Sequence, residues 1–280
     1  MSNPKIAIAG ASGNLGPAVL SALLEAGFTV TVLTRAGQKG SHQFDRRAQV
    51  AKVDYQSQES LISALRGHDA VVNTLGTVPR PVHLGLIDAA VAAHVPRFIP
   101  SEFGMDSAHP KASAFPIYAD KVAVQKYLQE KAAASGGQFA YTFLINDAVE
   151  LYDGGDRKFS ATTLAGVGKA ICGIIRNLEA TRNRTVYVRE VDVSQNQLLG
   201  MLKTTLPTKV VDTEELERNA WVEFKKPNPP LEIFLDFIRR NVFGEGYGGL
   251  LPAEALSNQL LGVREFSQDE LEKVVRDCGN

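Results

Sequence analysis

Seven residues close to the start of the chain, GASGNLG, combine three glycines in the spacing of a phosphate-binding loop. They follow an apolar run and precede a segment with helical spacing, as such loops do in dinucleotide-binding units. The first glycine permits the tight turn, the second lets the backbone approach a pyrophosphate, and the third lets helix and strand pack closely. Backbone N–H groups and the helix dipole then hold the anion; the alternative is a strand–helix turn without a ligand. We therefore predict a dinucleotide loop formed by Gly10, Ala11, Ser12, Gly13, Asn14, Leu15 and Gly16.

The end of the second predicted strand indicates which dinucleotide binds. An enzyme that uses NAD usually places an acidic residue there for the ribose hydroxyls, but the sequence from 33 to 39 contains none. Arg35 and Lys39 instead suit the 2′-phosphate of NADP, unless Arg35 is only a solvated loop charge. Asp54 and Tyr55 end the third strand, where they flank adenine or simply begin the next helix.

We also expect cofactor contacts at the ends of two later strands, from Thr74, Leu75, Gly76 and Asn146.

Lys121 is the residue whose type and position suit proton transfer. In a predicted helix it shares a face with Val124 and Leu128, so its ammonium group is directed inward. Beside an apolar site and a cationic nicotinamide ring, such a lysine can act as an acid or a base. It can also bind the nicotinamide ribose, or lie at the surface with its stem over apolar residues. The sequence leaves these alternatives open.

These residues are positioned by alternating apolar strands and amphipathic helices. The pattern predicts an α/β chain: a Rossmann-type doubly wound parallel sheet with a smaller, mainly helical substrate lobe. Residues 1–149, with a contribution from about 185–206, form the predicted nucleotide domain; 150–184 and 207–280 form the smaller lobe. The predicted strands are 5–10, 29–34, 50–55, 70–75, 97–100, 139–145 and 185–191, and the predicted helices are 15–26, 60–66, 82–93, 118–135, 164–175, 195–202, 231–242, 254–261 and 268–276.

Composition and charge exclude several classes of protein. The chain has 280 residues, 44% of them apolar and 22% charged, as in a globular protein. The 30 Lys and Arg residues balance 31 Asp and Glu residues, which argues against a nucleic-acid partner. Two distant cysteines, Cys172 and Cys278, do not indicate a metal site. Without a signal peptide or a long apolar segment, we expect no membrane association and a reducing, cytoplasmic setting. We expect a small-molecule substrate, and the sequence does not define an oligomeric state.

The glycine loop, Arg35, the Pro-Ser-Glu-Phe-Gly run at 100–104 and Lys121 together resemble the NmrA-like group of atypical short-chain dehydrogenases. The likeness covers almost the whole chain and is greatest to isoflavone reductase-like and phenylcoumaran benzylic ether reductase-like enzymes in their fungal form. The resemblance implies a Rossmann core, NADPH as cofactor and a small, largely helical substrate lobe. It also implies that Lys121, on the helix after the fifth strand, is the catalytic residue.

Within this resemblance, Glu102, Phe103 and Tyr118 are the candidates for substrate contact. Tyr118 precedes Lys121 by three residues, whereas the usual Tyr–Lys pair of short-chain dehydrogenases is four apart, so Tyr118 is not assigned the acid role. After residue 149 the chain runs directly into residues 150–156 and lacks the longer aromatic segment of the family. We therefore expect a more open pocket.

The sequence thus predicts an NADPH-dependent oxidoreductase of secondary metabolism. Its expected substrate is a small aromatic or polyketide-like carbonyl, enone or benzylic compound, with Lys121 handling the proton. Two other functions stay open at this point. One is a non-catalytic NADP(H) sensor that regulates a protein partner, which the short segment after 149 favours. The other is an isomerase or epimerase on the same fold.

Overall fold

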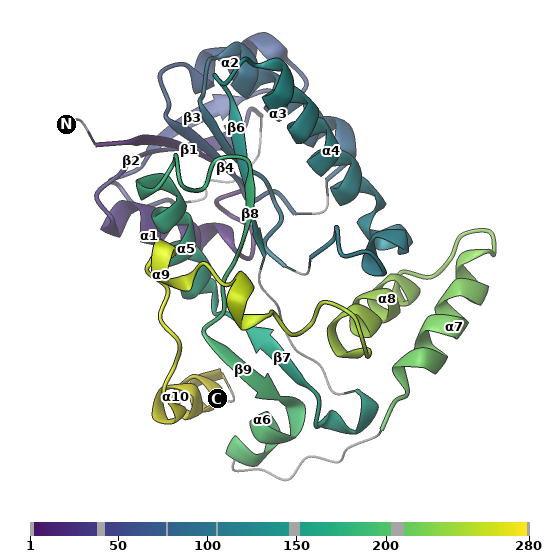
Figure 1. Ribbon diagram of the computed structural model, residues 1–280. Coiled ribbons are helices and arrows are strands. Elements are labelled where there is room, and N and C mark those ends of the chain that lie inside the picture. The colour runs from purple at the N-terminus through teal and green to yellow at the C-terminus, as the bar shows by residue number, and fades with distance from the viewer. Residues whose placement is uncertain are drawn as a thin grey trace.

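A seven-stranded parallel sheet forms the centre of the computed structural model (Figure 1). The structure describes residues 3–37, 43–76, 78–104, 106–145, 152–202 and 210–278, so Lys39, Asn146 and the start of the segment after 149 lie outside it. The strand order β3-β2-β1-β4-β5-β6-β8 reverses direction between β1 and β4, which confirms the predicted doubly wound fold. The strands are β1 (Lys5–Ala9), β2 (Thr29–Arg35), β3 (Gln49–Val53), β4 (Ala70–Asn73), β5 (Arg97–Ile99), β6 (Ala140–Ile145) and β8 (Arg184–Tyr187).

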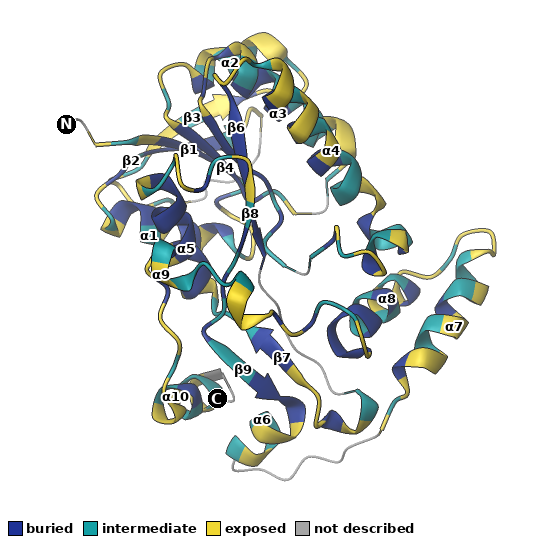
Figure 2. Ribbon diagram, viewed as in Figure 1, coloured by how far each residue is buried: buried dark blue, intermediate teal, exposed yellow. Residues whose placement is uncertain are grey.

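Helices cover both faces of the sheet, and each face has its own hydrophobic core (Figure 2). The strands read as continuous apolar runs because both faces are buried, as in β4, where all four residues are buried. On one face the first and fifth helices approach closely because Gly168 lacks a side chain: a Cβ there would lie 2.7 Å from the Cβ of Ala22. One face is covered by α1 (Gly16–Glu25) and α5 (Leu164–Arg176). The other face is covered by α2 (Gln58–Leu65), α3 (Arg80–Ala92) and α4 (Ala119–Ala134).

The other elements form a smaller lobe around a third hydrophobic core (Figure 1). This lobe is mainly helical, as predicted, but it also contains an antiparallel pair of strands, β7 (Lys158–Ala161) and β9 (Val191–Ser194). Its helices are α6 (Gln195–Met201), α7 (Thr213–Phe224), α8 (Glu232–Phe243) and α10 (Gln268–Cys278), whereas α9 (Asn258–Leu261) packs against α5. Four 3₁₀ turns complete the described elements: η1 (Ala112–Ala114), η2 (Pro116–Tyr118), η3 (Asp153–Gly155) and η4 (Ala253–Ala255).

The prediction of a single strand over 185–191 is wrong. The structure divides this segment, because β8 ends in the large sheet at Tyr187 and β9 begins in the small one at Val191. Between them Glu190 is buried, and its Oε2 accepts hydrogen bonds from the N–H and the hydroxyl of Thr163, at 2.8 and 2.7 Å. Since Thr163 caps α5, this contact anchors the chain where it turns from one sheet to the other.

The sequence pattern also fails to predict β7 and α7. A signal for α7 exists in Asp212, whose Oδ1 accepts from two backbone N–H groups of the first helical turn. The division of the chain at residue 149 stays a prediction, but the packing shows how its parts lie. Within 150–184, α5 packs against α1; within 185–206, β9 and α6 lie with β7 and α10.

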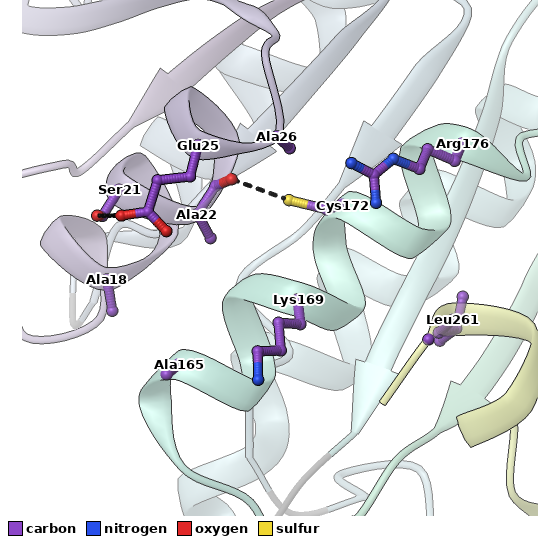
Figure 3. Close-up of a pocket in the computed structure, with 11 residues that line it drawn as sticks. Ala18, Ser21, Ala22, Glu25, Ala26, Ala165, Lys169, Cys172, Arg176 and Leu261 are labelled. Atoms are coloured by element: carbon purple, nitrogen blue, oxygen red, sulfur yellow. Dashed lines mark hydrogen bonds between the residues drawn. The ribbon is translucent and has the colours of Figure 1, made fainter. Parts of the chain in front are cut away.

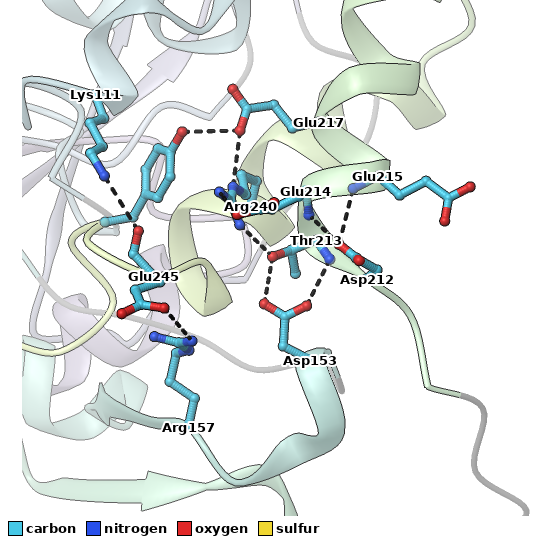
Figure 4. A network of polar contacts seen from close by, with 11 residues as sticks. Lys111, Asp153, Arg157, Asp212, Thr213, Glu214, Glu215, Glu217, Arg240 and Glu245 are labelled. Atoms are coloured by element: carbon cyan, nitrogen blue, oxygen red, sulfur yellow. Dashed lines mark hydrogen bonds and ion pairs between the residues drawn. The ribbon is translucent and has the colours of Figure 1, made fainter.

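A buried arginine ties the helices of the smaller lobe together (Figure 4). Arg240 on α8 donates from Nη1 to Thr213 Oγ1 at 2.8 Å and from Nε to Glu217 Oε2 at 2.9 Å, both on α7. The Thr213 hydroxyl donates to Asp153 Oδ2 at 2.6 Å, and the Tyr247 hydroxyl donates to Glu217 Oε2 at 3.1 Å. This network holds α7 and α8 against the η3 turn and the glycine-rich loop that carries Tyr247.

Candidate functional site

The predicted nucleotide loop lies at the carboxyl end of β1, where the strand order reverses direction. In open α/β sheets, ligands bind at this switch point. The described cofactor candidates lie at the carboxyl ends of neighbouring strands: Arg35 ends β2, Asp54 follows β3, and Thr74 follows β4. The topology therefore brings residues from four segments to one edge of the sheet.

Two of the three loop glycines are required by the fold, and the third is not. Gly10 has a φ of +87°, and a Cβ there would lie 2.6 Å from the carbonyl carbon of Thr74. A Cβ on Gly16 would lie 2.3 Å from the carbonyl oxygen of Gly10. On Gly13, which is exposed, the corresponding distance to the Gly10 oxygen is an ordinary 3.4 Å. The absent side chain of Gly13 thus leaves the loop backbone open from outside, which fits a pyrophosphate.

The start of α1 is arranged to receive an anion. Ser12, Gly13 and Asn14 are exposed, Leu15 is half-buried, and Ala11 is packed into the core. Among the described residues, no side chain caps this helix. Helix N-termini without a capping side chain present backbone N–H groups and the positive end of the helix dipole to a ligand.

The ends of β2 and β3 place a cation near a neutral phenol. Burial raises the pKa of Tyr55 to about 12, and the nearby guanidinium of Arg35 acts against this shift. The Tyr55 hydroxyl donates to the Leu33 carbonyl oxygen at 3.4 Å, while Arg35 is exposed. Asp54 accepts from the Gln56 N–H at 2.9 Å, so it shapes the turn before α2. The exposed Arg35 side chain therefore lies at the carboxyl end of β2, beside Tyr55.

The connection from β4 to α3 is fixed beside the glycine loop. Thr74 donates to the Ala9 carbonyl oxygen from both its N–H and its hydroxyl, each at 2.8 Å. Leu75 is half-buried and Gly76 is exposed. Because a Cβ on Gly10 would collide with Thr74, the two connections lie against each other and form one continuous edge.

Asn73 and His83 form a pair behind this connection that the sequence pattern does not single out. Asn73 is 1% exposed; its Oδ1 accepts from the Leu75 N–H at 3.0 Å, and its Nδ2 donates to His83 Nδ1 at 3.0 Å. Burial lowers the pKa of His83, Asp120 acts to raise it, and Lys121 acts to lower it. The bond from Asn73 requires a neutral imidazole ring, because Nδ1 must be the acceptor.

Acidification should therefore destabilise the protein through His83. A histidine whose pKa is lowered by folding is protonated first in the unfolded state. Its contribution to stability is complete above a pH of about 6.5 and is lost as the pH falls, at no more than about 1.4 kcal/mol per pH unit. In His83→Gln, whose Oε1 can still accept from Asn73, the apparent Tm should depend less on pH across this range. The exposed His94, changed in His94→Asn, is the control; the same pH slope in both variants would contradict the assignment.

Lys121 on α4 lies beside a buried carboxylate. Its Nζ is 3.9 Å from Glu102 Oε2, and the two side chains are 38% and 2% exposed. Glu102 Oε2 accepts from Ser107 Oγ at 2.9 Å, and Ser107 Oγ accepts from Gln125 Nε2 at 2.8 Å. Burial raises the pKa of the Glu102 carboxyl, while Lys121, Ser107 and Gln125 act to lower it. Opposite charges at this separation attract by about 1 kcal/mol in water and about 4 kcal/mol near a protein surface, before desolvation costs.

Ser107 and Gln125 are missed by the sequence analysis. Gln125 lies four residues after Lys121 on the same helix, which is the signal that the sequence offers. Ser107 gives no signal, because its role depends on a loop that returns to α4.

The two aromatic candidates for substrate contact are packed against protein. Tyr118 is 4% exposed in the core of the smaller lobe, and its hydroxyl accepts from Asn241 Nδ2 at 3.2 Å. Phe103 is half-buried and packs against the core on the α1–α5 face of the sheet. Contact of either ring with a substrate stays a prediction.

A groove of about 500 Å³ lies apart from this site, between α1 and α5 (Figure 3). Ala18 and Ala22 of α1 line it, together with Ala26 just after that helix. Cys172 lines it from α5, with its Sγ donating to the Ala22 carbonyl oxygen at 3.4 Å. The groove is lined by none of the predicted site residues.

The described part of the chain lacks two further kinds of feature. There, His, Cys, Asp and Glu side chains do not gather in any group of three or more that could hold a metal ion. None of the helices there combines the length and the apolar character that crossing a membrane requires.

Comparison with known proteins confirms the predicted family. The profile of the NmrA-like family matches residues 2–214. Oxidoreductase aprR of Aspergillus flavus is 34% identical to this chain over an alignment that covers 95% of the chain and 97% of that protein. The bifunctional pinoresinol-lariciresinol reductase of Linum perenne is 29% identical, with 70% and 73% covered. The binary complex of leucoanthocyanidin reductase with NADPH from Vitis vinifera has the same fold, with a TM-score of 0.76 at 20% identity and 97% and 99% covered.

Proposed function

The chain belongs to the NmrA-like family, and from this premise we infer that it is an NADPH-dependent oxidoreductase. We propose that its substrate is a small aromatic or polyketide-like carbonyl, enone or benzylic compound. The relatives support the reaction class and the cofactor: aprR is an oxidoreductase, and the leucoanthocyanidin reductase structure contains NADPH.

The residues at the sheet edge suit each part of the cofactor. The open backbone at Gly13 and the uncapped start of α1 suit the pyrophosphate. Arg35 suits the 2′-phosphate and Tyr55 lies near it, where adenine would be flanked. The connection after β4 lies against the end of β1, where Thr74 donates to the Ala9 carbonyl oxygen. These assignments share one physical basis, since all lie at the carboxyl ends of parallel strands.

The observation that carries the reaction is the half-buried Lys121 beside Glu102, close to the same edge. When bound, NADPH supplies the hydride. We assign the proton transfer to Lys121 Nζ, which lies on a partly exposed side chain. A positioned group of this kind exchanges a proton with a reacting atom as the charge on that atom changes.

The smaller lobe supports an aromatic substrate. Tyr247 is partly exposed and stacks on Phe115 with the ring centroids 5.7 Å apart. Trp221, also partly exposed, lies 6.2 Å from the same Phe115 ring. We propose that the exposed parts of these two rings contact a flat aromatic ligand through offset stacking and edge contacts.

The proposal is tested by following NADPH oxidation with a panel of aryl ketones, aryl enones and benzylic ethers. We expect turnover with at least one of them. Tight NADPH binding without turnover of any compound would overturn the reductase and favour the sensor. The turnover of one compound class over the others would define the substrate.

Cofactor choice should depend on Arg35. A charge-assisted contact with the 2′-phosphate is worth about 1.5–3 kcal/mol, which corresponds to roughly ten- to a hundredfold in Kd. In Arg35→Ala the affinity for NADPH should fall by this factor while that for NADH stays the same, as measured by fluorescence titration. Arg66→Ala, at an exposed position after α2, is the control. Equal losses for both cofactors in Arg35→Ala would sink the assignment.

A further inference from the structure

Glu102 has a place in the structure that the proposed function leaves unexplained. The residue is 1% exposed, so the carboxyl group faces protein partners and not open solvent. A buried carboxylate is costly unless hydrogen bonds and charges compensate it. Here the compensation comes from Ser107 at 2.9 Å and from Lys121 at 3.9 Å.

One helix supplies both ends of this arrangement. Lys121 and Gln125 are four residues apart on α4, and so lie on the same face in successive turns. Gln125 Nε2 donates to Ser107 Oγ at 2.8 Å, which directs the Ser107 hydroxyl proton toward Glu102. Gln125 is itself buried, so this orientation is fixed by packing. The carboxylate is therefore held relative to the helix that carries the ammonium group.

The distance between the two charges matters for the chemistry. At 3.9 Å the ammonium nitrogen of Lys121 lies beyond the 2.7–3.2 Å of a normal hydrogen bond to Glu102. The carboxylate attracts the positive charge without taking one of its protons into a short bond. The Lys121 side chain is 38% exposed, so an N–H can point toward a substrate.

We propose that Glu102 is a positioning residue that holds Lys121 in the ammonium form, so that Lys121 is the general acid for a carbonyl or enone substrate. The inference rests on the proposed function and narrows its substrate class. One Nζ–H bond of Lys121 breaks and an O–H bond forms on the substrate oxygen, as the carbon receives the hydride that NADPH supplies. NADPH is oxidised to NADP⁺, the substrate is reduced, and Glu102 stays a carboxylate. Lys121, left as a neutral amine, regains a proton from water at its exposed side.

Among the residues that the structure describes, four other charged or titratable groups lie near this pair. Asp120 precedes Lys121 on α4 and is paired with Arg80 of α3, at 3.4 Å. His83 of α3 interacts electrostatically with both Asp120 and Lys121, and its lowered pKa keeps it neutral. Asp106 acts on Glu102 from the loop before α4. The Asp120 charge is shared with Arg80, and Asp106 accepts a hydrogen bond from the Tyr187 hydroxyl at 2.9 Å. Glu102 is the buried carboxyl group that lies next to Lys121.

The test measures the protonation of Lys121 directly. Only a neutral amine reacts with acetic anhydride, so the rate of acetylation at a fixed, mildly alkaline pH reports the neutral fraction. The folded chain is acetylated first and then digested, and mass spectrometry of the peptides gives this rate for Lys121. The exposed Lys126 on the same helix serves as an internal standard. In Glu102→Gln, Lys121 should react faster by about threefold or more, and Lys126 at an unchanged rate. An unchanged Lys121 rate would overturn the proposal.

A second variant separates charge from loosened packing. Ser107→Ala removes a hydrogen bond to Glu102 but keeps the carboxylate. If charge is the cause, Ser107→Ala should accelerate acetylation much less than Glu102→Gln. Equal acceleration in the two variants would assign the effect to altered packing and contradict the proposal. If Glu102→Gln fails to fold, Ser107→Ala still tests the proposal, because it keeps the Glu102 carboxylate. An acetylation rate of Lys121 in Ser107→Ala as high as that of Lys126 would exclude control by the carboxylate.

Turnover supplies the final readout, with the aryl ketone or enone of the panel that is reduced fastest. A general acid must be protonated, so kcat falls at alkaline pH; without the Glu102 charge this fall should move to lower pH in Glu102→Gln. A KM that rises while the pH profile stays fixed would indicate a purely structural role and overturn the inference. Failure of the proposed function is distinguishable, because full activity in Lys121→Ala would remove the lysine from the reaction whatever the acetylation rates show.

Discussion

Replacing Lys121 by alanine should lower kcat by about 10²–10⁴-fold, which is the usual contribution of a general acid or base. The NADPH Kd should change little, because we propose that the glycine loop and Arg35 hold the cofactor. The side chain lies at the sheet edge beside Glu102, so its removal eliminates the proton carrier and leaves the sheet intact. The measurements are NADPH titration and the turnover of the saturated enzyme with a substrate from the panel.

Lys126→Ala is the matched control for this prediction. Lys126 lies on the same helix and is exposed, so its loss should change neither quantity appreciably. If Lys121 only binds the nicotinamide ribose, the affinity for NADPH should fall by more than the turnover does. Unchanged turnover in Lys121→Ala would remove the residue from the mechanism.

A pair of glycine variants should separate the fold from cofactor binding. A Cβ on Gly16 would lie 2.3 Å from the Gly10 carbonyl oxygen and 2.5 Å from Ala11 backbone atoms. Backbone cannot yield as a flexible side chain does, so Gly16→Val should destabilise the protein by about 3 kcal/mol or more. That is a large part of a typical stability of about 5–15 kcal/mol. The apparent Tm, measured by circular dichroism, should fall by many degrees.

Gly13→Val should show the opposite behaviour. Its Cβ meets the nearest atom at an ordinary 3.4 Å, so the apparent Tm should stay close to that of the unmodified chain. The branched side chain would occupy the space where we place the pyrophosphate, so NADPH binding should be lost. Gly13→Ala, with a smaller side chain, should weaken binding less. Normal NADPH affinity in Gly13→Val would show that the pyrophosphate lies elsewhere.

Some features of this protein follow from residues that are close together in the sequence. Gly10 and Gly16 mark a tight strand–helix junction. The steric reason for Gly16 lies within six residues of chain, at the Gly10 carbonyl oxygen, whereas the steric limit on Gly10 comes from Thr74 in a distant segment. The alternation of apolar strands and helices predicts the doubly wound sheet, because buried parallel strands need helices on both faces. The position of Lys121 on the side of Val124 and Leu128 follows from helical periodicity alone.

Other features depend on which distant segments meet. The sequence does not indicate that Glu102 faces Lys121 and bonds Ser107, or that Asn73 pairs with His83, because no local pattern specifies loop geometry. Likewise, the apolar pattern at 185–191 predicts one strand, yet the structure divides this segment between two sheets, with a buried contact from Glu190 to the start of α5 at the turn. Periodicity identifies a buried face, but not the element that covers it. The sequence alone therefore determined the fold class and the candidate site residues, whereas tertiary packing decided which charges and hydrogen bonds surround Lys121.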